Sequence, residues 1–81
     1  MKQLFLMSTC GCHLCEVAEG VLVSTLDAAA YIVDEIDIAE DDAMIEKYGI
    51  RIPVLVDEAS GKELGWPFDQ AELLNFLAKL S

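Results

Sequence analysis

Three cysteines within six residues place the strongest constraint on what this chain can fold into. They occupy positions 10, 12 and 15, directly after an apolar run at residues 3–7 and at the start of an amphipathic segment. In the first turn of a helix, Cys12 and Cys15 are close enough to join, and the positive end of the helix dipole favours a thiolate there. This spacing is typical of a redox centre that exchanges thiols and disulfides.

Length and charge limit the classes of function. The 81 residues make one small domain, residues 1–81, and the 54% hydrophobic content is enough for a core. Fifteen acidic residues against five basic ones give a formal net charge of −10, which opposes binding to nucleic-acid phosphates or anionic lipid headgroups. We therefore expect a monomer with neither nucleic acid nor a membrane as partner.

The distribution of apolar residues and cysteines indicates a compartment. No apolar run approaches the length of a membrane span, and residues 4–7 are too few for the core of a signal peptide. The cysteines are odd in number and clustered, whereas structural disulfides form a framework spread over the chain. We expect a cytoplasmic protein whose disulfide is transient.

Hydrophobic periodicity predicts alternating strands and helices in the first half of the chain. Residues 3–7 form a run typical of a buried strand, and residues 31–38, rich in β-branched side chains, predict a second one. Between them, apolar residues recur every three or four positions and predict one core-facing side of a helix, formed by Leu14, Val17, Ala18, Val21, Leu22 and Leu26. We then expect a short helix that Asp41 or Asp42 caps, that runs through Tyr48 and that Gly49 ends, with one apolar side formed by Met44, Ile45 and Tyr48.

The second half predicts a hairpin and a last helix. Residues 54–56 and 62–64 read as antiparallel strands joined by a turn at residues 58–61. Asp69 starts the final helix, with Glu72 completing a capping box and Phe68 packing on Leu73 as a hydrophobic staple. The predicted order is β-α-β-α-β-β-α.

This order, with Cys-x-x-Cys at the first helix and Ile-Pro before the third strand, resembles the thioredoxin fold in its minimal, glutaredoxin-like form. The string GCHLCE at residues 11–16 resembles the G-C-x-L-C-[DE] segment of small glutaredoxin-like proteins, and KYGIRIP at residues 47–53 resembles the Y-G-I-R-G-I-P of thioredoxin with one residue fewer. The resemblance covers nearly the whole chain. It implies an α/β fold with a four-stranded mixed sheet flanked by three helices.

The same resemblance implies roles for individual residues. Cys12 would be the attacking thiol and Cys15 the resolving thiol, with Pro53 a cis-proline that faces them. A cis bond would turn the Ile52 backbone outward, where it can pair with an extended substrate.

Three further positions lie in the segments that the resemblance brings to the site. Gly65 and Trp66 stand where glutaredoxins usually carry a glycine pair that helps to hold glutathione, so half of that pair is missing here. The resemblance also places the Trp66 loop beside the cysteines, and Trp66 can pack that loop against the last helix. Arg51 is either an ordinary solvated side chain or a contact for an anionic substrate.

The environment of Cys12 predicts a pKa below the value of about 8.5 for a free thiol. The helix N-terminus lowers it, and a protonated His13 would add to this effect. Glu16 and the net negative charge act in the opposite direction, so we expect no extreme depression.

Cys10 departs from the family pattern, which commonly has proline before the Gly-Cys pair. It is either a semi-buried spare thiol, a partner in a disulfide with Cys12 or Cys15, or part of a three-thiol metal site with His13 nearby. Because pairing across a single intervening residue is strained, the Cys12–Cys15 bond is favoured.

Two functions follow from these observations. The first is a thiol–disulfide oxidoreductase that needs no resident cofactor and acts on a disulfide-bearing or glutathionylated protein, with glutathione or a reductase as electron donor. The alternative is a metal or iron–sulfur carrier that uses Cys10, Cys12 and Cys15 as thiolate ligands. The chain has one histidine and no second Cys/His pair, which favours the oxidoreductase.

Overall fold

The computed structural model describes residues 2–80 and confirms the predicted order of strands and helices. The elements are β1 (Lys2–Ser8), α1 (His13–Thr25), β2 (Tyr31–Asp37), α2 (Asp42–Tyr48), β3 (Val54–Asp57), β4 (Glu63–Gly65) and α3 (Gln70–Ala78). A 3₁₀ turn, Ile38–Glu40, links β2 to α2. The sheet is mixed, with strand order β2-β1-β3-β4, and only the β1–β2 pair is parallel among the described strands.

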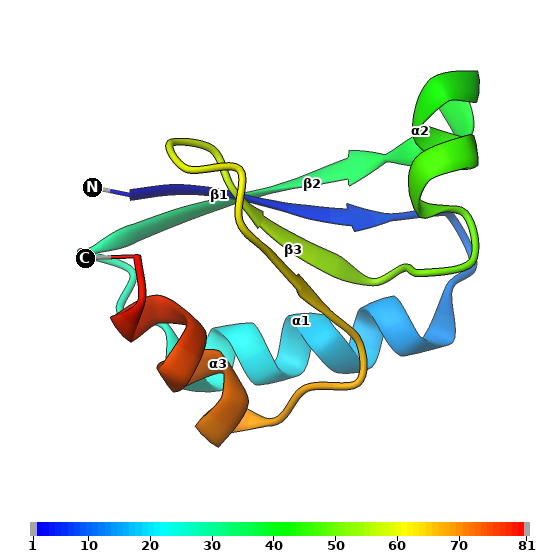
Figure 1. Ribbon diagram of the computed structural model, residues 1–81. Coiled ribbons are helices and arrows are strands. Elements are labelled where there is room, and N and C mark those ends of the chain that lie inside the picture. Colours follow the sequence, from blue (N-terminus) through cyan, green and yellow to red (C-terminus); the bar gives the residue numbers. More distant parts are fainter. Residues whose placement is uncertain (1, 81) are drawn as a thin grey trace.

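The sheet carries α1 and α3 on one face and α2 at one end of the other face (Figure 1). Alternation along β1 supplies both faces, because Leu4 and Leu6 point into the larger core while Phe5 and Met7 belong to the smaller one. In the larger core, Leu4 and Leu6 pack against side chains from α1, β3, the loop before α3 and α3 itself. These are Ala18, Leu22, Leu55, Phe68, Leu73, Phe76 and Leu77. The smaller core lies under α2 and contains Ile38, Tyr48, Val54 and Val56.

The core-facing side of α1 is rotated from the predicted one. Cys15, Ala18 and Leu22 are buried, whereas Leu14 and Val17 are 48% and 42% exposed. Apolar residues occupy most sides of this helix, so their spacing alone did not define which side faces the sheet. In α2 the prediction for Ile45 is wrong in the same way, since Tyr48 is buried but Ile45 is 43% exposed.

The hairpin and the last helix follow the prediction with a shift of one residue. β4 begins at Glu63 rather than at position 62, because Lys62 lies in the turn, where its carbonyl accepts a hydrogen bond from the Asp57 N–H. Asp69 caps α3 by accepting from the Glu72 N–H at 2.9 Å, and Phe68 and Leu73 share the larger core. No helix in residues 2–80 has the length and apolar character needed to cross a membrane.

Candidate redox site

A tight turn after β1 delivers Cys12 to the start of α1. Gly11 adopts a φ of 79°, in the left-handed region that disfavours side chains, and the Cys12 N–H donates to the Thr9 carbonyl at 3.3 Å. Cys12 is the N-cap of α1, with extended backbone angles. The turn therefore places its sulfur where the unpaired N–H groups of the first helical turn converge.

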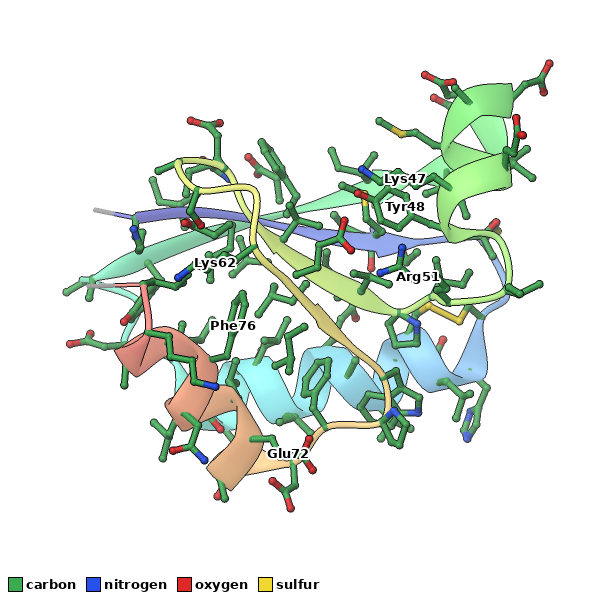
Figure 2. All side chains as sticks on the ribbon, viewed as in Figure 1. Lys47, Tyr48, Arg51, Lys62, Glu72 and Phe76 are labelled. Atoms are coloured by element: carbon green, nitrogen blue, oxygen red, sulfur yellow. A yellow bond between two sulfur atoms is a disulfide. The ribbon has the colours of Figure 1, made fainter. Side chains whose placement is uncertain are left out.

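Cys12 and Cys15 form a disulfide, with their Cα atoms 5.3 Å apart (Figure 2). The Cys15 N–H also points at the Cys12 sulfur, at 3.1 Å. Cys15 is 3% exposed, whereas Cys12 is half-buried, so the two sulfurs differ in accessibility. An incoming group can reach Cys12 more readily than Cys15.

A polar cavity of about 220 Å³ adjoins the disulfide. The β1–α1 turn and α1 form most of its wall through Thr9, Cys10, Gly11, Cys12, Cys15, Glu16 and Glu19, and Glu35 of β2 completes it. Three of these residues carry carboxylates and none carries a basic group. The cavity next to the sulfurs is thus strongly acidic.

Cys10 and His13 lie at the exposed rim of this region. Cys10 is an exposed free thiol rather than a semi-buried one, because it occupies the turn before the helix. His13 is also exposed, as the first residue of α1. Within residues 2–80, no group of three or more Cys, His, Asp or Glu side chains is arranged to hold a metal ion.

Pro53 lies where β3 begins, and the loop after β4 runs beside it. The Ile52–Pro53 bond is cis, as is Trp66–Pro67. The Trp66 N–H donates to the Pro53 carbonyl at 3.1 Å, and Gly65 is paired with Val54, the next residue along β3. The Trp66 ring meets Phe68 edge-on at 5.1 Å between centroids, so Trp66 also packs the loop onto the larger core.

The Ile52 backbone is partly used inside the chain. Its N–H donates to the Tyr48 carbonyl at 3.1 Å, which removes this group from the pairing with a substrate strand that the resemblance suggested. The side chain is half-buried against the smaller core. Any main-chain pairing with substrate at this residue would rely on its carbonyl.

Arg51 is held by a carboxylate of its own chain. Its guanidinium donates to Glu63, and Lys47 lies 3.7 Å from the same carboxylate (Figure 2). The Tyr48 hydroxyl donates to Glu63 at 2.9 Å. The pKa of Glu63 is lowered, first by the Arg51 hydrogen bond and then by that of Tyr48, against the opposing effect of burial. Arg51 therefore links the segment before Pro53 to β4.

Sequence reasoning missed the carboxyl pair formed by Glu19 and Glu35. The pKa of Glu19 is raised, mainly by a hydrogen bond with Glu35 that needs a proton on one of the two groups, with smaller effects of burial and of the charges on Glu35 and Glu16. Glu19 lies one helical turn after Cys15, which was the available signal. Glu35 comes from a neighbouring strand, and sequence spacing did not reveal it.

The fold and the Cys-x-x-Cys disulfide together define a glutaredoxin-like protein. Residues 3–78 match the family described as Glutaredoxin-like domain (DUF836), and the chain belongs to that family.

Two solved structures are similar to this chain in both sequence and fold. The X-ray structure of Northeast Structural Genomics target protein XcR50 from X. campestris is 37% identical, with a TM-score of 0.83 over 94% of this chain and 96% of that one. The solution structure of XcR50 is also 37% identical, with a TM-score of 0.80 over 98% of this chain and 95% of that one. Among curated proteins, none matches this chain.

Proposed function

We propose that the protein is a thiol–disulfide oxidoreductase that works through the Cys12–Cys15 couple. The observation that carries this proposal is the pairing of one accessible and one buried sulfur at the N-terminus of α1. The accessible sulfur suits attack on a substrate, and the buried one suits a second, intramolecular step. The N-terminal N–H groups of the helix stabilise a thiolate at Cys12.

The reaction transfers two electrons to the substrate. In the reduced protein, the Cys12 thiolate attacks one sulfur of a substrate disulfide, forms a mixed disulfide and releases the other substrate sulfur as a thiolate. The Cys15 thiol then gives up its proton and attacks the Cys12 sulfur. This step forms the Cys12–Cys15 disulfide and releases the second substrate thiolate, so that one substrate disulfide becomes two thiols.

The substrate class is a disulfide-bearing or glutathionylated protein, and no resident cofactor takes part. Two glutathione molecules, which become one glutathione disulfide, or a dithiol reductase return the couple to its reduced form. This cycle suits a monomer in a reducing compartment such as the cytoplasm. Pro53, Gly65 and Trp66 would form the substrate platform beside Cys12, joined by the hydrogen bond between Trp66 and Pro53.

Turnover of a disulfide-bonded test protein by three single variants tests the proposal. Cys12→Ser should lose all turnover, because no thiolate starts the exchange. Cys15→Ser should stop after one exchange and accumulate a mixed disulfide, whereas Cys10→Ser should keep turning over. Equal residual turnover in Cys12→Ser and Cys15→Ser would reject the assigned roles, and metal in freshly purified protein that is lost in all three variants would favour the carrier instead.

A further inference from the structure

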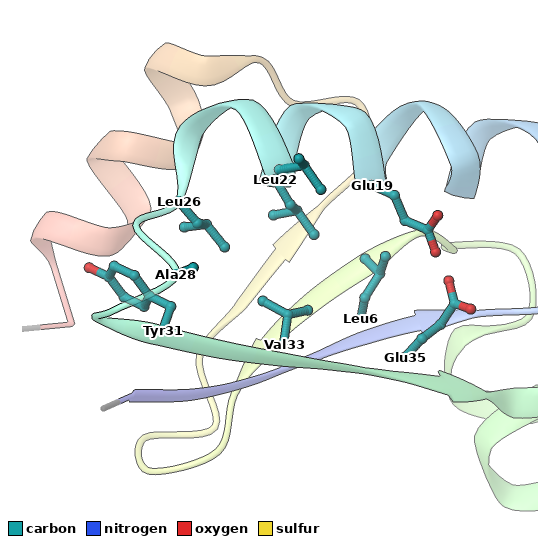
Figure 3. A pocket seen from close by; sticks show the side chains of 9 residues that line it. Leu6, Glu19, Leu22, Leu26, Ala28, Tyr31, Val33 and Glu35 are labelled. Atoms are coloured by element: carbon teal, nitrogen blue, oxygen red, sulfur yellow. The ribbon is translucent and has the colours of Figure 1, made fainter.

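An apolar groove of about 360 Å³ lies between α1 and β2, next to the polar cavity that adjoins the disulfide (Figure 3). Its floor contains Leu6 and Leu22, which are buried, and its sides include Leu26, Tyr31 and Val33, which are half-buried. β2 is an edge strand of the sheet, so this groove opens at the side of the molecule.

Glu19 and Glu35 line both the apolar groove and the polar cavity beside the disulfide. Their carboxyl groups point toward one another from α1 and β2 (Figure 3). Ion pairs and cation–π contacts in residues 2–80 occupy other carboxylates and rings, and none involves this pair. Two facing carboxyl groups without a cation repel one another unless they share a proton, and a cation between them would remove that repulsion.

We propose that the groove and the carboxyl pair dock a basic, apolar segment of the disulfide-bearing substrate, an inference that rests on the function proposed above. A Lys or Arg of the substrate lies between Glu19 and Glu35, and a large apolar side chain fills the groove over Leu22 and Leu26. The reacting cysteine of the substrate then faces Cys12. The net charge of −10 attracts such a segment and repels acidic ones.

The geometry of α1 sets the spacing of these substrate residues. Glu19 lies about 10 Å along the helix from Cys12, and Leu26 about 21 Å, at a rise of about 1.5 Å per residue. An extended peptide advances about 3.3 Å per residue. The docked segment therefore carries its cation about three residues from the reacting cysteine and its apolar residue about six residues from it.

Binding of labelled peptides to the oxidised protein tests the docking without any chemistry. The reference peptide carries serine in place of cysteine, arginine three positions away and leucine six positions away. Matched peptides replace the arginine by glutamate or the leucine by serine. Fluorescence anisotropy should give a dissociation constant roughly three- to tenfold lower for the reference peptide than for the glutamate peptide, with a smaller ratio at high salt. The leucine-to-serine change should weaken binding roughly threefold or more.

Charge-matched variants locate the site. Glu19→Gln with Glu35→Gln should bring the ratio between the arginine and glutamate peptides close to one. Glu58→Gln, which removes a carboxylate of the β3–β4 turn that lines neither the groove nor the polar cavity, should leave that ratio unchanged. Equal binding of the arginine and glutamate peptides, or a ratio that the double variant does not change, would overturn the proposal. So would a dimer in sedimentation that covers the groove and disappears in Leu26→Glu.

Reduction of the neutral disulfide of 2-mercaptoethanol separates this proposal from the proposed function. If the protein reduces that compound but binds the arginine and glutamate peptides equally, the docking site is rejected and the oxidoreductase function is retained. A peptide preference in binding without reduction of any disulfide would support the docking site and reject the oxidoreductase.

Discussion

Carboxylates toward the two ends of the sheet have opposite surroundings and opposite pKa shifts. Toward the N-terminus of β1, Asp57 is fully buried, accepts hydrogen bonds from the Ser60 hydroxyl and N–H at 2.6 and 3.1 Å, and lies 3.6 Å from the Lys2 ammonium. Its pKa is lowered, first by Ser60, with burial opposing and Lys2 assisting. Toward the other end, Glu19 faces Glu35 instead of a cation, and its pKa is raised.

The difference separates a structural carboxylate from one that is available to a ligand. Asp57 finds its partners within the chain, with one carboxylate oxygen bonded twice to Ser60 and the other facing the Lys2 ammonium, and it organises the β3–β4 turn. Glu19 and Glu35 are exposed and adjoin the disulfide, and they lack such partners among the described ion pairs. A like-charge pair beside a reactive centre is where a cationic partner gains most.

The largest effect that this contrast predicts is on stability. Asp57→Ala should lower the free energy of unfolding by roughly 2–3 kcal/mol, because it removes charged hydrogen bonds from a buried turn. Glu19→Ala, at the other end, should leave it nearly unchanged. Urea denaturation of both variants measures this, and similar losses in the two would break the distinction between a structural and a free carboxylate.

A smaller effect is the dependence of stability on pH. The folded pKa values of Asp57 and Glu63 are lowered, so their contribution is complete above the unfolded values of about 3.9 and 4.3 and is lost as the pH falls through the folded values. Glu19 has the opposite effect. Because its pKa is raised in the folded protein, the free energy of unfolding falls as the pH rises through that pKa.

Urea titrations below pH 7 check both signs. Asp57→Asn should reduce the loss of unfolding free energy at low pH. Glu19→Gln should remove a shallow fall in the free energy of unfolding above about pH 4.3. If Asp57→Asn loses as much unfolding free energy at low pH as the unsubstituted protein does, other carboxylates are responsible for that loss.

The smallest expected effect is the titration of Cys12, whose pKa should lie moderately below the free-thiol value of about 8.5. In the oxidised protein the Cys15 N–H already points at the Cys12 sulfur, and after reduction it would face the thiolate. The acidic cavity limits the depression. The Cys12 pKa can be measured from alkylation rates against pH in Cys15→Ser, resolved by residue, with exposed Cys10 as the internal reference. A Cys12 pKa at or above that of a free thiol would favour the metal carrier.

Local signals in the sequence were sufficient for the order of elements and for the Cys12–Cys15 disulfide. Each strand and helix had its own periodicity and turn residues, and the Cys12–Cys15 spacing needed only the helix start. The orientation of α1 was not predictable in this way, because Leu14 and Val17 fit a helical stripe as well as Cys15 and Ala18 do. Packing against the sheet selected between them.

Features that join distant segments could not be predicted from spacing. Glu35 meets Glu19 only because β2 lies beside β1 under α1, and Arg51 meets Glu63 only because β4 follows β3 in the sheet. Sequence separation conceals such contacts, whereas the fold places them at one site. The acidic character of the polar cavity beside the disulfide therefore emerged from the structure, although the net charge of −10 was visible at the outset.

Trapping the exchange intermediate tests the central claim most directly. Cys15→Ser protein, reduced and mixed with a disulfide-bonded substrate, should form a mixed disulfide that peptide mapping by mass spectrometry assigns to Cys12. The double variant Cys10→Ser with Cys15→Ser should form the same adduct. An adduct on Cys10, or none on Cys12 while Cys10 reacts, would contradict the assignment of Cys12 as the attacking thiol.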